Sequence, residues 1–180
     1  MIICITNRIG CKIDFLKKVE EIASKVDMII LREKDLTVIE YMSLASQVQK
    51  ICKKKGVFFT INTFIHAFTE LDADYLQLSY TDFCKMTIKQ RNNMKIGVSV
   101  HSESEALNAC KLGAKFIIVG HIFETNSKKG LEPKGVKLLR SIIELVDIPV
   151  YAVGGIDYKN MKELFKVGAS GVCMMSYFMK

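Results

Sequence analysis

The stretch ESEALNACKLGAKFIIV, residues 103–119, contains one full copy of the pattern that decides the fold. Its first part, Glu103 to Leu112, places apolar residues at helical spacing. Gly113 comes next, where a glycine ends a helix in the left-handed conformation. The last part, Phe116 to Val119, is a continuous apolar run, which is typical of a strand buried on both faces. A helix that leads into such a strand predicts parallel pairing with a neighbouring strand.

This pattern recurs along the whole chain. Val167-Gly168-Ala169 repeats the glycine between helix and strand, and Leu71-Asp72-Ala73-Asp74 holds the equivalent place without it. Eight strand-like runs are expected, at 2–6, 28–31, 57–61, 75–78, 96–100, 116–119, 150–153 and 171–174, and amphipathic stretches lie between most of them, at 13–24, 37–54, 103–112, 136–145 and 160–167. Eight such units in 180 residues predict an α/β fold, a (β/α)₈ TIM barrel in which residues 1–180 form a single domain.

The chain stops at Lys180, a few residues after the eighth strand. We therefore expect a barrel that lacks a full final helix. An apolar flank left without that helix predicts association, and we expect a homodimer.

Composition limits the classes of function. Hydrophobic residues make up 49% of the chain, enough for a large core, and the net charge of +7 indicates a lysine-rich surface or a field that attracts anionic substrates. The basic residues are scattered and no nucleic-acid motif accompanies them, so a nucleic-acid partner is not expected. No apolar run has the length of a membrane span, and MIICITNR at the start predicts a strand rather than a signal peptide.

Six cysteines occur without a Cys-x-x-Cys pair. This spacing predicts neither a zinc site nor a disulfide framework. Buried, reduced thiols in a cytoplasmic protein are the expectation.

The active site of such a barrel lies at the carboxyl ends of its strands. Segment 119–135, VGHIFETNSKKGLEPKG, leaves the sixth strand and gathers proton-transfer and anion-binding groups, among them His121, Thr125, Ser127 and Lys128. His121 is the best candidate for acid–base catalysis, because imidazole both donates and accepts protons near neutral pH. The plainer interpretation is a histidine that hydrogen-bonds a loop.

Two other strand exits carry anion-binding features. Gly154 and Gly155 follow the seventh strand, where backbone amides can approach a phosphate closely; the plainer interpretation is a tight turn. Arg32 and Lys34 follow the second strand and are candidates for clamping an anion. Their plainer interpretation is a local ion-pair network with the neighbouring acids, Glu33 and Asp35.

The other two histidines have weaker cases. The segment around His101 and Ser102 fits the cap of the helix that follows. His66 lies in a helical stretch away from the strand ends, where a structural role is expected.

Several short motifs together resemble the family of thiamine phosphate synthase and its relative, the thiazole tautomerase TenI. These motifs are LREKDL at 31–36, GVSVHS at 97–102, DIPV at 147–150 leading to GGI at 154–156, and GASGV at 168–172 leading to Ser176. They occur in the family's order and cover nearly the whole chain.

Two positions separate the branches of this family. The synthase has Gly-Pro-Ile-Phe after the sixth strand, whereas this chain has His121 in place of the proline. The synthase also has Ile-Asn-Asp-Arg after the third strand, with an aspartate that binds Mg²⁺, whereas this chain has Thr63 there. Asp82 matches the second acidic position, but one carboxylate alone makes a poor site for Mg²⁺ and pyrophosphate.

The resemblance therefore implies a thiazole tautomerase, in which His121 shuttles a proton and aromatises a phosphorylated thiazole carboxylate without metal or cofactor. It implies substrate-binding positions at Arg32, Lys34, Asn62, Ser99, His101, Thr125, Ser127 and Lys128, and phosphate-binding positions at Gly154, Gly155, Met175 and Ser176. Three alternatives remain open: a synthase that joins a pyrimidine pyrophosphate to thiazole phosphate and uses Mg²⁺ through Asp82, a catalytically silent phosphate-binding regulator, and a phosphosugar isomerase.

Overall fold

The computed structural model describes residues 1–125 and 128–180. Its eight strands are hydrogen-bonded in chain order, β1 to β8, as a closed barrel of parallel strands. The predicted (β/α)₈ fold is confirmed. The chain also divides into two compact units, Met1–Gln77 with Met175–Lys180 and Leu78–Met174, and each unit is described by itself. The expectation of a single domain stays a prediction.

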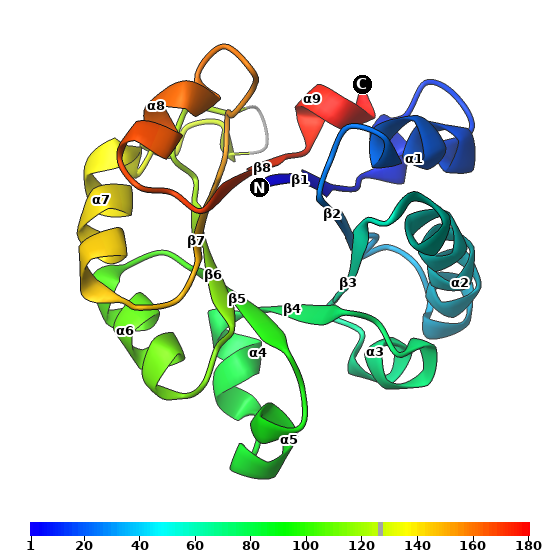
Figure 1. The fold of residues 1–180 in the computed structure, drawn as a ribbon, viewed down its shortest axis with the longest axis horizontal. Coiled ribbons are helices and arrows are strands. Elements are labelled where there is room, and N and C mark those ends of the chain that lie inside the picture. The colour runs from blue at the N-terminus through cyan, green and yellow to red at the C-terminus, as the bar shows by residue number, and fades with distance from the viewer. Residues whose placement is uncertain (126–127) are drawn as a thin grey trace. The chain divides into compact units, whose positions relative to one another are not determined.

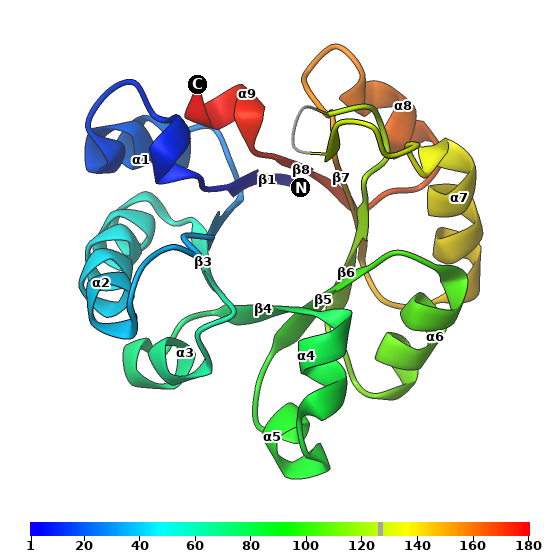
Figure 2. The same ribbon diagram turned by 180° about the vertical axis from the view of Figure 1, so that it is seen from behind.

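In the first unit, helices pack along one face of three parallel strands. Helices α1 and α2 lie side by side along strands β1 to β3 (Figure 1), and the view from behind agrees (Figure 2). Met28 pairs with Ile3 on one side and with Phe58 on the other. The elements are β1 (Ile2–Ile5), η1 (Arg8–Gly10), α1 (Phe15–Ala23), β2 (Met28–Leu31), α2 (Val38–Lys55), β3 (Phe58–Asn62), α3 (Ile65–Leu71), the start of β4 (Tyr75–Ser79) and α9 (Ser176–Met179).

The second unit repeats the arrangement, with α6 and α7 side by side along β5 to β7 (Figures 1 and 2). Every residue of β6 and β8 is buried, as expected for strands covered on both faces. Gly120, the last residue of β6, pairs with Val153 at the end of β7. The elements are α4 (Tyr80–Lys85), α5 (Ile88–Asn92), β5 (Ile96–Val100), α6 (Glu103–Lys111), β6 (Phe116–Gly120), α7 (Gly135–Leu145), β7 (Val150–Val153), α8 (Met161–Lys166) and β8 (Gly171–Met174).

The helix ends show why the predicted pattern works. Gly113 and Gly168, each three residues before the first residue of a strand, have φ of 93° and 98°. Asp72, which stands in the equivalent place without a glycine, has φ of 48° and caps α3 in the left-handed conformation. Aspartate tolerates this conformation better than most residues, so the chain turns here despite the missing glycine.

Two short helices between β4 and β5 were not expected from the apolar pattern. Ser79 caps α4 by accepting a hydrogen bond from the backbone of Asp82, and Thr87 caps α5 in a capping box with Gln90. Both helices are too short for a recognisable apolar stripe, so these local capping bonds are the only sequence signal for them.

The cysteines only partly match the expectation of buried thiols. Cys4, Cys52 and Cys173 are buried, and burial raises the pKa of Cys52 to about 12. Cys84, however, lies exposed on α4. The expectation is therefore wrong for Cys84.

Across residues 1–125 and 128–180, no helix has both the length and the apolar character needed to span a bilayer. The longest of the helices described above, α2, ends on Lys53, Lys54 and Lys55.

Candidate active site

His121 follows β6 directly and is buried, with 9% of its surface exposed. The peptide bond that joins it to Gly120 is cis. Its Nε2 lies 3.3 Å from the carbonyl oxygen of Leu131. Because a carbonyl oxygen only accepts hydrogen bonds, Nε2 is the donor, and the neutral ring keeps its lone pair on Nδ1. The ring therefore bonds a loop, as the plainer interpretation expects, and still offers one basic nitrogen.

The loop after β6 folds back onto the backbone around His121. Lys134 donates its backbone N–H to the carbonyl oxygen of His121 at 2.9 Å, and Gly135 donates to that of Ile122 at 3.1 Å. These bonds hold the start and the end of the loop together. The carbonyl of Leu131 lies within hydrogen-bond distance of the imidazole.

Three predicted binding residues belong to this loop. The backbone N–H of Lys128 donates to the carbonyl oxygen of Thr125 at 3.0 Å. The Lys128 side chain is exposed and has no ion-pair partner among residues 1–125 and 128–180. Ser127 lies outside the described residues. Lys128 is therefore available to an anion, whereas Thr125 helps to shape the turn.

The two glycines after β7 lie against the His121 segment. Gly154 accepts a hydrogen bond from the backbone of Phe123 at 3.0 Å. A Cβ placed on Gly154 would lie 2.5 Å from the Cβ of His121, so only glycine fits there. Within the described part of the chain, neither Gly154 nor Gly155 uses its backbone N–H in a hydrogen bond. Two adjacent amides without a partner are available to an anion, and their role in phosphate binding stays a prediction.

His101, at the exit of β5, also lies beside the His121 segment. Its Nδ1 lies 2.8 Å from the carbonyl oxygen of Gly120. The expected cap is present as well, since Ser102 accepts the backbone N–H of Glu105 at the start of α6. Ser99, another predicted binding residue, is half-buried on β5. The structure thus brings His101, His121 and Gly154 together at the exits of three adjacent strands. His66 lies exposed on α3, in the other unit.

In the first unit, the acids beside Arg32 and Lys34 pair with a different residue. Arg8 forms an ion pair with Asp35 and lies 4.0 Å from Glu33. The plainer interpretation of Arg32 and Lys34, a local ion-pair network among residues 32–35, is therefore wrong. Lys34 and Asp35 lie in a turn after β2, in which the backbone N–H of Leu36 donates to the carbonyl oxygen of Glu33 at 3.5 Å, and both acids lie within reach of Arg8. The side chains of Arg32 and Lys34 have no ion-pair partner among the described residues, which favours an anion-binding role.

Glu33 is a buried carboxylate that holds the exits of β1 and β2 together. It is 2% exposed and accepts hydrogen bonds from the Thr6 hydroxyl at 2.6 Å and from the backbone N–H of Arg8 at 3.0 Å. The Thr6 hydroxyl in turn accepts the backbone N–H of Arg32 at 3.0 Å. Burial raises the pKa of Glu33, although the hydrogen bonds from Thr6 and Arg8 and the charge of Arg8 oppose the shift.

The side chain of Asn62, a predicted binding residue, is used locally. Its amide donates to the side chain of Gln77, and its carbonyl accepts the hydroxyl of Thr63 at 3.1 Å. Its backbone N–H donates to the hydroxyl of Tyr41 at 3.2 Å. Asn62 is therefore better suited to shaping the exit of β3 than to binding a substrate.

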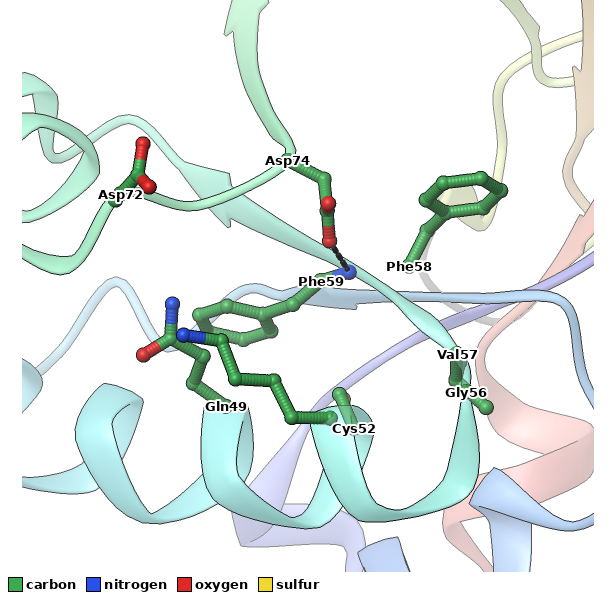
Figure 3. A pocket seen from close by; sticks show the side chains of 9 residues that line it. Gln49, Cys52, Gly56, Val57, Phe58, Phe59, Asp72 and Asp74 are labelled. Atoms are coloured by element: carbon green, nitrogen blue, oxygen red, sulfur yellow. Dashed lines mark hydrogen bonds between the residues drawn. The ribbon is translucent and has the colours of Figure 1, made fainter.

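A pocket of about 230 Å³ lies in the first unit, and none of the candidate site residues described above lines it (Figure 3). It opens at the amino end of β3, beside Phe58 and Phe59, and Asp74 lines it while accepting the backbone N–H of Phe59 at 2.8 Å. Active sites of such barrels lie at the opposite ends of the strands. This pocket is therefore not part of the candidate site.

Comparison with known proteins now identifies the family. The family model described as thiamine monophosphate synthase matches residues 2–178. The chain is 38% identical over 178 residues to "Putative thiamine-phosphate synthase 2" of Aquifex aeolicus, covering 98% of this chain and 96% of that protein. It is 33% identical over 166 residues to the thiamine-phosphate synthase of Fusobacterium nucleatum, covering 91% and 81%.

A solved structure agrees. Thiamine phosphate pyrophosphorylase from Pyrococcus furiosus superposes with a TM-score of 0.85 at 29% identity, covering 97% of this chain and 85% of that one. The chain belongs to the thiamine monophosphate synthase family. The resemblance read from its motifs is confirmed at this level, and the protein is an enzyme of thiamine biosynthesis.

The Mg²⁺ ion that the resemblance implies for a synthase would find few ligands among the residues present. Position 63 supplies a threonine hydroxyl, and that hydroxyl already donates to Asn62. Asp82 accepts the Ser79 hydroxyl at 2.6 Å and lies 3.6 Å from the ammonium of Lys85. Within residues 1–125 and 128–180, no three His, Cys, Asp or Glu side chains form a group able to hold a metal ion. The donors present do not fit the metal site of the synthase branch.

Sequence reasoning missed Thr6 and Arg8 altogether. Both follow β1 and contact Glu33, which is 27 and 25 positions away. Their position could have indicated them, because they are polar residues directly after the first strand and the active site of this fold lies at the carboxyl ends of the strands. Met175 and Ser176 come directly after β8 in the chain and are assigned to the first unit. Their role in phosphate binding stays a prediction.

Proposed function

We propose that this member of the thiamine monophosphate synthase family is a thiazole tautomerase. Its substrate is a non-aromatic thiazole carboxylate that carries a phosphate, and its product is the aromatic tautomer. The observation that carries the proposal is His121, a buried imidazole at the exit of β6 with Nε2 bonded to Leu131 and Nδ1 left basic.

The chemistry needs only a group that moves a proton. One C–H bond of the substrate breaks, its electron pair enters the ring, and a proton returns at another carbon of the same molecule. Atoms and electrons balance without an oxidant, a reductant or a second substrate. The Nδ1 atom of His121 takes the proton and delivers it, which is general acid–base catalysis by one residue.

Free backbone amides support the binding of the substrate phosphate. Gly154 and Gly155 each leave an N–H without a partner among the described residues, and Gly154 contacts His121 directly. A phosphate held there lies beside the catalytic group. Lys128 supplies a positive charge from the same loop system. The resemblance adds Arg32, Lys34, Met175 and Ser176 as further binding positions.

The second candidate is a thiamine phosphate synthase, which the names of the similar proteins favour. Position 63 weighs against it. Thr63 has φ of 71°, a conformation that a β-branched residue adopts at a cost and aspartate adopts more easily. The backbone here thus suits the carboxylate that the synthase branch carries, yet the residue is a threonine.

Two assays on one preparation separate the candidates. The tautomerase assay follows the absorbance of the aromatic thiazole phosphate as it forms in the presence of a metal chelator. The synthase assay follows thiamine phosphate formed from hydroxymethylpyrimidine pyrophosphate and thiazole phosphate with Mg²⁺. Turnover in the first assay alone supports the proposal, and turnover in the second alone replaces it with the synthase. The predicted homodimer is tested separately by light scattering.

A further inference from the structure

His101 makes one side-chain contact that helix capping does not explain. Its Nδ1 lies 2.8 Å from the carbonyl oxygen of Gly120, the residue before His121. A carbonyl oxygen only accepts, so Nδ1 carries the proton in the neutral ring as well as in the charged one. The contact therefore fixes both the tautomer and the orientation of the imidazole.

The backbone of His101 is anchored independently of its ring. Its N–H donates to Oε2 of Glu105 at 2.7 Å, a bond that any residue except proline supplies. Ser102 caps α6 through the backbone of Glu105 at 3.2 Å. Neither bond needs an imidazole at position 101. Among the described residues, the bond to Gly120 is the only hydrogen bond of the His101 ring.

The carbonyl of Gly120 belongs to the peptide that enters His121. After His121, two further hydrogen bonds hold the backbone. The backbone N–H of Lys134 donates to the carbonyl oxygen of His121 at 2.9 Å, and the backbone N–H of Ile122 donates to the carbonyl oxygen of Val153 at 2.9 Å. The backbone of His121 is thus held from the loop and from β7, while His101 holds it from β5. Among the described residues, removing the His101 contact leaves the carbonyl oxygen of Gly120 without a side-chain hydrogen bond.

We infer that His101 is a positioning residue for His121. It acts through the Gly120 carbonyl and sets the place from which the His121 ring meets the substrate. The inference rests on the proposed tautomerase function for its kinetic consequence, but its structural part does not.

A matched pair of variants isolates the hydrogen bond. His101→Asn places a side-chain N–H near the position of Nδ1, and His101→Leu has similar size without a donor. We expect His101→Leu to lower kcat about ten-fold, with KM changed less than about two-fold, because small misplacements of a catalytic group cost rate rather than binding. His101→Asn is expected to stay within about three-fold of the wild type, as one retained hydrogen bond predicts.

Kinetics can overturn the inference in two ways. Equal loss in both variants means that the His101 ring itself exchanges protons with the substrate. Wild-type kcat in His101→Leu means that the contact has no role in positioning.

Nuclear magnetic resonance tests the structural part without turnover. The chain has three histidines, so ¹⁵N-labelled histidine gives a spectrum simple enough to assign. We expect the Nδ1–H tautomer for His101, and His121 ring signals that are displaced in His101→Leu but not in His101→Asn. An Nε2–H tautomer for His101, or unmoved His121 signals in His101→Leu, overturns the inference. The expected spectra together with an inactive wild type would contradict the proposed function alone.

Discussion

Gly154 packs against His121 so closely that a Cβ at residue 154 would lie 2.5 Å from the Cβ of His121 and 2.7 Å from its Cα. Gly154 also has φ of 107°, which side chains rarely adopt. The glycine after β7 therefore does more than bend the chain. It makes room for the candidate catalytic residue beside the free amides.

The first prediction concerns this packing. Gly154→Ala should lower the free energy of unfolding by roughly 2–5 kcal/mol, the sum of about 1–2 kcal/mol for the positive φ and about 1–3 kcal/mol for displacing neighbours. Activity should fall as well, because His121 must move. Urea unfolding and the tautomerase assay measure the two effects.

Gly113→Ala is the matched control. Gly113 has φ of 93°, but nothing lies within 4 Å of an added Cβ. Its cost should be only the conformational part, about 1–2 kcal/mol, with activity retained. Equal losses in the two variants would show that contact with His121 has no role.

The second prediction concerns the buried hydroxyl of Tyr41. It donates to the carbonyl oxygen of Leu31 at 2.6 Å and accepts the backbone N–H of Asn62 at 3.2 Å, and so joins the exits of β2 and β3. Tyr41→Phe removes both of these buried hydrogen bonds and should lower the free energy of unfolding by about 1–3 kcal/mol in urea titrations.

Tyr80→Phe is the control for Tyr41. The Tyr80 hydroxyl accepts from the amide of Asn108 at 2.7 Å at a half-buried position. Water can replace this partner, so the loss should stay below about 1 kcal/mol. A loss for Tyr41→Phe no larger than this one would contradict the bridging role.

The third prediction is a pH dependence due to Glu33. Burial raises its pKa above the ordinary value of 4.5 in the folded state. Between that value and the raised one, the folded state binds more protons than the unfolded state, so the contribution of Glu33 to stability falls as pH rises. The wild type should therefore lose stability relative to Glu33→Gln as pH rises from 4.5 through the folded pKa.

Paired urea titrations of the wild type and Glu33→Gln, from about pH 4 to about pH 8, measure this difference. Other carboxyl groups affect both proteins alike and cancel. A difference that is flat, or that favours the wild type as pH rises, would contradict the raised pKa.

The alternation of strand and helix could be predicted from the sequence because it depends on local signals. Apolar runs such as Phe116 to Val119 and glycines such as Gly113 act within a few residues of themselves. The structure places β6 at Phe116–Gly120 and gives Gly113 the expected positive φ. The two short helices α4 and α5 were not predicted, because their capping residues are the only local signal in the sequence for them.

The site was only partly predictable, because its contacts join distant strand exits. His121 and Gly154 stood out by residue type and place. The pairing of Arg8 with Glu33 and Asp35 did not, because Arg8 follows a different strand and the opposite charges at positions 32–35 could equally pair among themselves. The contact of His101 with Gly120 depends on a neighbouring strand, which no spacing within 97–102 reveals.

The final prediction concerns His121 itself. His121→Asn removes the imidazole and its basic nitrogen, and the shorter amide does not extend to the position of the Nε2 atom that bonds Leu131. Tautomerase turnover should fall by about 10²–10⁴-fold, the usual contribution of a general acid–base group. Binding of the aromatic product, followed by thermal shift, should persist because the amides of Gly154 and Gly155 remain.

The most direct measurement is the tautomerase assay on wild type and His121→Asn, run beside the Mg²⁺-dependent synthase assay on the same preparations. We predict that the wild type aromatises the thiazole carboxylate phosphate in the presence of chelator, that His121→Asn has lost this activity, and that neither forms thiamine phosphate. Thiamine phosphate formation by a wild type that fails to aromatise the tautomer, or product binding without turnover in either assay, would contradict the assignment of His121 as the proton-transfer residue of a tautomerase.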